Sequence, residues 1–212
     1  MQLLPQATFE ELLGAVDMLC IPSSKEMMDN LYKDVLSIVI PADTLPSPAE
    51  LCGQKSSGIL LYGKWKDKKI KILIYADHDK LTEATAYSVT KKLSIRAKSE
   101  QVEKTGLMVH HLSSPELIKS ALTGWTAGLY DLGIYKNTEE NSLNHSGSSL
   151  FTFLPDGMNP STALEGITIG LVQREVMDLV NTPANHQSPA LLGEWAMQSA
   201  SAYGYLATIL DK

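Results

Sequence analysis

The strongest constraint on the fold lies in residues 162–212, whose sequence predicts a helix, a tight loop, a second helix and a short strand. Thr162 and Glu165 have the spacing of a capping box, which marks the start of a helix. Apolar residues then recur at intervals of three and four positions, as one buried helical stripe requires. The stripe consists of Leu164, Ile167, Leu171, Val172, Val176, Leu179 and Val180.

The loop between the two helices begins after Val180, with Asn181-Thr182-Pro183-Ala184-Asn185. Pro183 biases Thr182 away from helical dihedral angles, so the first helix cannot continue through this segment. Asparagine and proline are also ordinary turn-forming residues. We therefore expect these five residues to fix the connection between the two helices.

The second helix has clear start and stop signals. Ser188 is a suitable N-cap, and Pro189 at the first helical position loses no hydrogen bond, since that N–H would be unpaired in any helix. Gly204 suits the left-handed position that ends a helix. The apolar residues 205–210 that follow predict a short strand.

This run of motifs resembles the entry to the catalytic domain of the leucyl aminopeptidases (cytosol aminopeptidases). In that family, Asn-x-Pro-x-Asn is followed after a few residues by Thr-Pro and a helix. Asn181, Pro183 and Asn185 match the first motif, and Ser188-Pro189 takes the place of Thr-Pro. The likeness covers the whole chain in layout, and specific motifs from about residue 165 to 195.

Alternating strand and helix patterns before residue 155 indicate an α/β fold by themselves. The predicted helices are 9–13, 24–33, 81–97 and 114–130, and the predicted strands are 15–22, 35–40, 58–63, 69–76, 106–111 and 150–154. Strands 58–63 and 69–76 are joined by a lysine-rich tip, which predicts a β-hairpin. Residues 131–148 have the composition of a linker.

The resemblance implies a macro-like amino-terminal α/β domain, with a mixed sheet flanked by helices, followed by a long connecting helix and the start of a second α/β domain. The expected boundaries are 1–155 for the amino-terminal domain, 156–181 for the linker and connecting helix, and 182–212 for the start of the catalytic domain. At 1.5 Å per residue, the connecting helix would span roughly 28 Å, which is enough to join two domains.

Composition limits the partners and the cellular location that we expect for the protein. The net charge of −6 argues against general affinity for nucleic acid. Two cysteines do not make a disulfide framework, and no signal peptide or membrane-spanning run is present in the sequence. We therefore expect a cytoplasmic protein that does not associate with a membrane.

The resemblance also implies an activity for the parent protein, which would remove amino-terminal residues from peptides with two divalent metal ions, zinc or manganese. In the family the metal ligands lie in motifs beyond the Asn-x-Pro-x-Asn loop, and this sequence contains none of these motifs. We therefore assign no catalytic residue, metal ligand or cofactor to this chain, which is expected to be inactive by itself. The chain would contribute architecture and subunit contacts, and the parent family forms hexamers.

Other candidate residues are weaker. Asp77, His78 and Asp79 follow a predicted strand, where open α/β sheets bind ligands, although a solvated turn is the favoured interpretation. His110 and His111 are predicted to point to opposite faces of a strand, which disfavours a shared metal. The lysines of residues 64–71 are predicted to form a charged hairpin tip that resists edge pairing.

A second function remains open at this stage. The macro-like domain could be a binding module without enzymatic activity, holding a nucleotide-like ligand at the strand ends or nucleic acid at the lysine hairpin. The sequence lacks a glycine-rich phosphate loop, which counts against the nucleotide version. Under either function, the apolar end at 189–210 needs cover, either from the amino-terminal domain or from another copy of the chain. We favour another copy and expect the chain to self-associate through residues 162–210.

Overall fold

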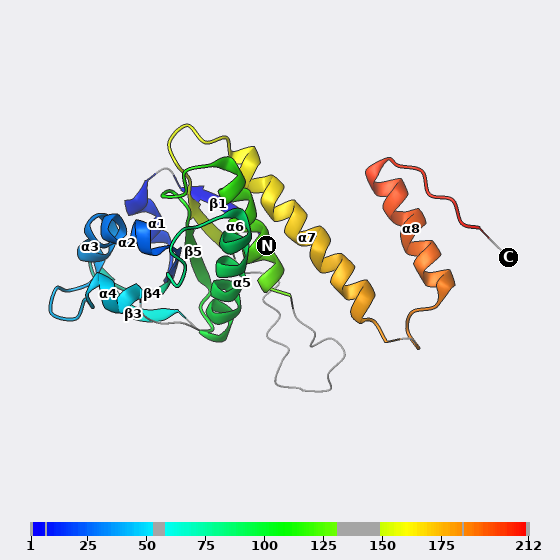
Figure 1. Cartoon of the computed structure of the whole chain (residues 1–212). Coiled ribbons are helices and arrows are strands. Elements are labelled where there is room, and N and C mark those ends of the chain that lie inside the picture. Colours follow the sequence, from blue (N-terminus) through cyan, green and yellow to red (C-terminus); the bar gives the residue numbers. More distant parts are fainter. Residues whose placement is uncertain (1, 7, 53–57, 131–148, 184, 211–212) are drawn as a thin grey trace.

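A six-stranded sheet with helices on both faces forms the centre of the computed structural model (Figure 1). The structure describes residues 2–6, 8–52, 58–130, 149–183 and 185–210, and the predicted linker at 131–148 lies outside the described residues. The strand order is β1-β6-β5-β2-β4-β3. In that order the strands are Gln2–Gln6, Ser149–Phe153, Lys104–Met108, Met18–Pro22, Lys68–Tyr75 and Ile59–Trp65.

Neighbouring strands are parallel except at one edge, where β3 pairs antiparallel with β4. These two strands form the predicted hairpin, with Trp65 opposite Lys68 at its tip. Lys66 in the two-residue turn has a positive φ of 54°, the left-handed conformation that short hairpin turns require. The sheet is therefore mixed, as predicted. The edge strand β1 was not predicted.

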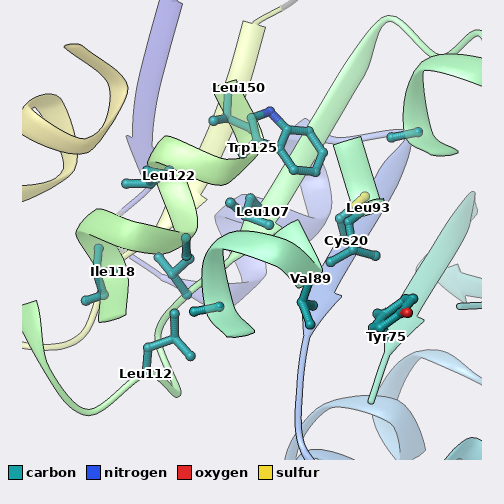
Figure 2. Close-up of a cluster of buried hydrophobic side chains, with 14 of the residues drawn as sticks. Cys20, Tyr75, Val89, Leu93, Leu107, Leu112, Ile118, Leu122, Trp125 and Leu150 are labelled. Atoms are coloured by element: carbon teal, nitrogen blue, oxygen red, sulfur yellow. The ribbon is translucent and has the colours of Figure 1, made fainter. Parts of the chain in front are cut away.

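Side chains alternate between the two faces of the central strands, as the pleat of a β-strand dictates. In β2, Met18 and Cys20 enter one apolar cluster, whereas Leu19 and Ile21 enter the other. The first cluster also contains residues of α5 (Glu83–Ser99), α6 (Pro115–Gly128) and α7 (Pro160–Asn181). Figure 2 shows this cluster, with Leu93 of α5 and Trp125 of α6 among its labelled side chains.

Shorter helices cover the opposite face of the sheet. They are α1 (Phe9–Ala15), α2 (Lys25–Leu31), the π-helical turn η1 (Tyr32–Leu36), α3 (Ser37–Val39) and α4 (Pro48–Cys52). Their buried side chains pack with those of β2 and β4 in the second cluster. The result is a three-layer α/β/α arrangement, which confirms the predicted fold class.

The prediction of a strand at residues 35–40 was wrong, because this segment is helical through η1 and α3. Its β-branched residues favoured a strand. However, Val35, Leu36, Val39 and Ile40 are the buried positions. These four residues are two pairs of neighbours, and the pairs are four positions apart, which is the spacing of a helical face. Burial of this face against the sheet therefore determined the conformation.

The connecting helix α7 begins two residues earlier than predicted. Asn159 is its N-cap, with the side-chain oxygen accepting a hydrogen bond from the Ser161 N–H at 2.9 Å, and Pro160 occupies the first position. Thr162 and Glu165 therefore lie inside the helix, and the predicted capping box is wrong. Glu165 instead forms an ion pair with Lys119 of α6 at 2.6 Å.

The buried face of α7 also differs from the predicted stripe. Its buried residues are Ala163, Gly166, Ile167 and Gly170, whereas most of the predicted stripe is exposed. The exposed members are Leu164, Leu171, Val172, Val176 and Val180. Small residues bring α7 against α6, and the larger apolar side chains are left on the outer face.

Helix α8 (Pro189–Tyr203) follows the loop after α7 and lies beyond α7 from the sheet in Figure 1. The Ser188 hydroxyl accepts a hydrogen bond from the Leu191 N–H at 3.3 Å, and Gly204 ends the helix with a φ of 74°. These predicted caps are confirmed. Residues 205–210 form no strand, because no neighbouring strand in the described part of the chain is available to pair with them.

Candidate functional site

The carboxyl ends of the central strands carry the polar side chains that could serve a function. Asp77, His78 and Asp79 follow β4, and the backbone joins this turn to the start of α2. The N–H groups of Lys25 and Glu26 donate hydrogen bonds to the carbonyl oxygens of His78 and Asp79, at 2.9 and 3.3 Å. The turn therefore fixes the position of α2 at this edge of the sheet.

The side chains of the turn have partners within the protein. The carboxylate of Asp77 accepts a hydrogen bond from the buried Tyr75 hydroxyl at 3.0 Å and lies 3.1 Å from the His78 ring. Lys92 donates to the same Tyr75 hydroxyl at 2.5 Å, and this hydrogen bond raises the pKa of Lys92. These contacts link β4 to α5.

The carboxylate of Asp79 forms an exposed ion pair with Lys25 at 2.7 Å. The hydrogen bond from Lys25, and then its charge, lower the pKa of Asp79. Within the described ranges, no three or more His, Cys, Asp or Glu side chains form a group that could hold a metal ion. The geometry of Asp77, His78 and Asp79 is that of a hydrogen-bonded turn.

The two histidines after β5 have different environments. His110 stacks on Phe153 of β6, with ring centroids 4.2 Å apart and an angle of 17° between the planes. His111 is hydrogen-bonded through Nε2 to the Pro22 carbonyl oxygen at 2.5 Å. Burial lowers the pKa of His111 to about 4, so its ring is neutral at physiological pH. Both residues follow β5, which ends at Met108, rather than lying within a strand as predicted.

These histidines line a cavity of about 350 Å³ between the strand ends and the α2–η1 helix. Its lining combines apolar side chains with acidic and amide groups on the helix. The lining residues are Phe9, Glu26, Met27, Asn30, Leu31, Asp34, Val35, Met108, His110, His111 and Phe153. Sequence reasoning missed this cavity, because the predicted helix ended at residue 33, whereas the observed helix continues through η1 and places Glu26, Asn30 and Asp34 along one side.

The lysine hairpin is largely neutralised by its neighbours. Lys68 pairs with Asp17 at 3.0 Å, and Lys71 pairs with Glu100 at 2.9 Å. At the tip, Lys64 lies 3.7 Å from Asp67. These acidic partners weaken the attraction that the hairpin would exert on phosphate groups.

The Asn-x-Pro-x-Asn segment forms the joint between α7 and α8. The Asn181 side-chain amide donates to the Tyr130 hydroxyl at 3.2 Å and to the Met177 carbonyl oxygen at 2.8 Å. The Pro183 carbonyl oxygen accepts a hydrogen bond from the His186 N–H at 2.8 Å, and Asn185 is exposed in the same turn. The joint is thus tied to the end of α6 through Asn181.

Beyond this joint, α8 and the tail present an apolar surface to solvent. Trp195 is 37% exposed and Leu206 is 98% exposed, although both are large apolar residues. The other exposed residues of this surface are Leu191, Leu192, Met197, Tyr203, Tyr205, Ile209 and Leu210. Monomeric soluble proteins rarely expose contiguous apolar surfaces of this kind without a function for them.

Neither models of protein families nor curated protein sequences match this chain. Solved structures do. A tomato leucine aminopeptidase mutant is similar over 96% of this chain and 43% of its own, with a TM-score of 0.66 and 17% identity. The bottromycin maturation enzyme BotP, with and without Mn, is similar over 90% of this chain, with a TM-score of 0.62 and 16% identity.

The chain spans 43% of the tomato enzyme and 37–38% of the BotP chains. At these identities the comparisons establish the fold. Within the described ranges, no helix combines the length and the apolar character that a membrane span requires. The Asn181–Asn185 motif predicted a resemblance to the leucyl aminopeptidases, and this resemblance is confirmed for the architecture. The chain has the α/β fold of the amino-terminal domain of the leucine aminopeptidases.

Proposed function

We propose that this chain is the amino-terminal part of a metal-dependent aminopeptidase, a hydrolase that removes amino-terminal residues from peptides. The observation that carries the proposal is the coincidence of fold and motif. The fold is similar to leucine aminopeptidase over 96% of the chain. The Asn-x-Pro-x-Asn segment lies at the joint between α7 and α8, where the resemblance expects the catalytic domain to begin.

The proposed role of this chain is architectural. Its α7 is packed on α6 through small residues on one face and presents Leu171, Val172 and Val176 on the other. Burying a large apolar side chain is worth about 1.5–3 kcal/mol, so these positions favour contact with a further domain or subunit. The exposed apolar surface of α8, on the other side of the joint, favours such a contact for the same reason.

The chemistry of the parent enzyme would require two divalent metal ions, zinc or manganese. Metal ions supply a hydroxide nucleophile at neutral pH and polarise the scissile carbonyl group. The described part of this chain offers no group of three or more metal-ligating side chains. In the family that this chain resembles, the ligand motifs lie well after the Asn-x-Pro-x-Asn loop, and we propose the same position for the metal ligands of the parent enzyme. We further propose a cytoplasmic, oligomeric enzyme, with the hexamer of the parent family as the expected assembly.

The test is to express this chain together with the coding sequence that follows Lys212 in its gene. We expect the longer product to hydrolyse leucine p-nitroanilide when Mn²⁺ or Zn²⁺ is present, whereas residues 1–212 show no turnover above the blank without protein. Chelation of the metal is the control for the longer product. A stop codon directly after Lys212, or a downstream region without Lys, Asp and Glu ligand motifs, would contradict the proposal.

A binding module remains the second candidate function, because the structure contains a cavity at the carboxyl ends of β5 and β6. Glu26 and Asp34 in its lining disfavour the phosphates of a nucleotide. The ion pairs of the lysine hairpin, such as Lys68 with Asp17, disfavour nucleic acid. The cavity therefore supports a ligand of a different charge.

A further inference from the structure

The cavity between the α2–η1 helix and the ends of β5 and β6 has the size of a small-molecule site. Its volume of about 350 Å³ lies within the range of ligand pockets. Phe9, Met27 and Met108 give it an apolar wall. Carboxyl ends of strands in open α/β sheets are common places for ligands, so both its position and its size are suitable.

The charged residues in the lining have one sign. Glu26 and Asp34 are separated by two helical turns, with Asn30 between them, so the three side chains lie along one side of the helix. The lining residues include neither lysine nor arginine, and no described ion pair involves either carboxylate. Such a site attracts a positively charged group and repels an anion.

The half-buried His111 in the lining fixes the polarity of its own ring. A carbonyl oxygen can only accept, so the Nε2 of His111 must donate to Pro22. In the neutral ring the proton is then on Nε2, and Nδ1 carries a lone pair. This Nδ1 is buried and has no hydrogen-bond partner among the described residues. An unpaired buried acceptor costs free energy, and this one lies beside the cavity rather than on its accessible wall.

The lining also contains a flat aromatic pair. The rings of His110 and Phe153 are stacked, and both residues line the cavity. Aromatic faces attract planar apolar groups and cations. The shape and the charge of the lining therefore agree on one class of ligand.

We propose that this cavity binds a small organic cation with N–H donors at its charged end and a flat apolar body. An amidinium or guanidinium group on an aromatic body belongs to this class. The carboxylates of Glu26 and Asp34 would face the cation, and the His110–Phe153 pair would contact the flat body.

Benzamidine is a suitable probe, because it is a planar cation with N–H donors, and benzoate is the matched anion of nearly the same shape. Each compound is titrated into the full chain, and methionine methyl signals are followed by NMR spectroscopy. We expect benzamidine to shift the signals of Met27 and Met108, which line the cavity, and to leave those of Met177 and Met197 on α7 and α8 unchanged. Benzoate should shift none of these signals, and added salt should weaken the binding of benzamidine.

Three variants test the assignment of the charge. Glu26→Gln and Asp34→Asn should each weaken benzamidine binding by about twofold to fivefold, the range for partly exposed charge pairs. Asp29→Asn is the matched control, since Asp29 is an exposed carboxylate on the same helix outside the lining, and it should leave the affinity unchanged.

Several outcomes would overturn the proposal: equal binding of benzoate, equal affinity in all three variants, signal changes away from Met27 and Met108, or the absence of any change. None of these outcomes depends on peptidase activity. Failure here is therefore distinguishable from failure of the proposed enzymatic function.

Discussion

A Cβ atom on Gly166 of α7 would lie 2.6 Å from the carbonyl oxygen of Lys119 on α6. One turn further along α7, a Cβ atom on Gly170 would lie 2.5 Å from the Cβ atom of Thr126. The Thr123 hydroxyl, between these two contacts, lies 2.9 Å from the Gly166 carbonyl oxygen and donates to it. The first half of α7 is thus part of the amino-terminal core.

We predict that Gly166→Ala destabilises the domain by about 1–3 kcal/mol, because the added methyl group meets backbone that cannot yield without moving a helix. Urea unfolding followed by circular dichroism measures the difference. Gly14→Ala is the matched control, since no atom lies within 4 Å of its Cβ position and alanine favours the helix. Equal stability of wild type and Gly166→Ala would contradict the packing described for α6 and α7.

We also predict different effects for two truncations. A chain ending at residue 181 keeps the buried Ala163 and Ile167 and should unfold cooperatively, whereas a chain ending at residue 159 loses both. Burial of Ile167 in the core contributes about 1.5–3 kcal/mol to the free energy of unfolding. The shorter chain loses this contribution and should have a clearly lower unfolding midpoint. The predicted domain boundary near residue 155 would be supported if the two chains were equally stable.

Local chemistry made parts of this fold predictable. The start of α8 at Ser188-Pro189 and its end at Gly204 follow from hydrogen bonding and dihedral preferences of single residues, and both are confirmed. The β3–β4 hairpin could also be predicted from the sequence, because two apolar runs are separated there by a short polar tip. Such signals act over a few residues, so they do not depend on the rest of the fold.

Long-range packing decided the parts that the sequence did not reveal. The periodicity of α7 indicated Leu171 and Val172 as buried, but Gly166 and Gly170 permit a closer approach to α6 and are the buried residues. Likewise, the cavity is lined by residues of α1, α2, η1, β5 and β6, which are far apart in the sequence. Its carboxylates and Phe153 line one site only because the fold brings these elements together. No pattern within a single segment contains this information.

A pH-dependent stability is expected from His111. Burial lowers its pKa from 6.5 to about 4 in the folded chain, so the unfolded chain binds more protons between these values. Stability should therefore be full above pH 6.5 and should fall as the pH drops toward 4, by on the order of 2–3 kcal/mol from this residue. Urea unfolding of wild type and His111→Asn at several pH values measures the contribution.

The His111→Asn variant keeps a side-chain N–H that can reach the Pro22 carbonyl oxygen but cannot titrate in this range. We expect its stability to depend less steeply on pH than that of the wild type. The remaining slope reports the other groups of the chain whose pKa values differ between the folded and unfolded states. Parallel curves for the two proteins would show that His111 is not buried as a neutral ring.

The last prediction concerns the apolar surface of α8 and the tail, which includes Trp195, Leu192 and Leu206. Each large apolar side chain left in water forgoes about 1.5–3 kcal/mol of burial, so several together favour association. We expect residues 1–212 to self-associate when the proposed catalytic domain is absent. Light scattering should give a mass above that of one chain for 1–212 and a lower mass for a chain ending at residue 181.

A double variant locates the contact without a truncation. Leu192→Lys with Trp195→Lys places two like charges in the centre of this surface, so association should weaken strongly while the sheet domain is unaffected. Gln198→Lys is the control, because it adds a charge on the same exposed helix at a position that is already polar. If 1–212 is a single chain in solution, or if the double variant keeps the mass of the wild type, then α8 is not the surface through which copies of this chain associate.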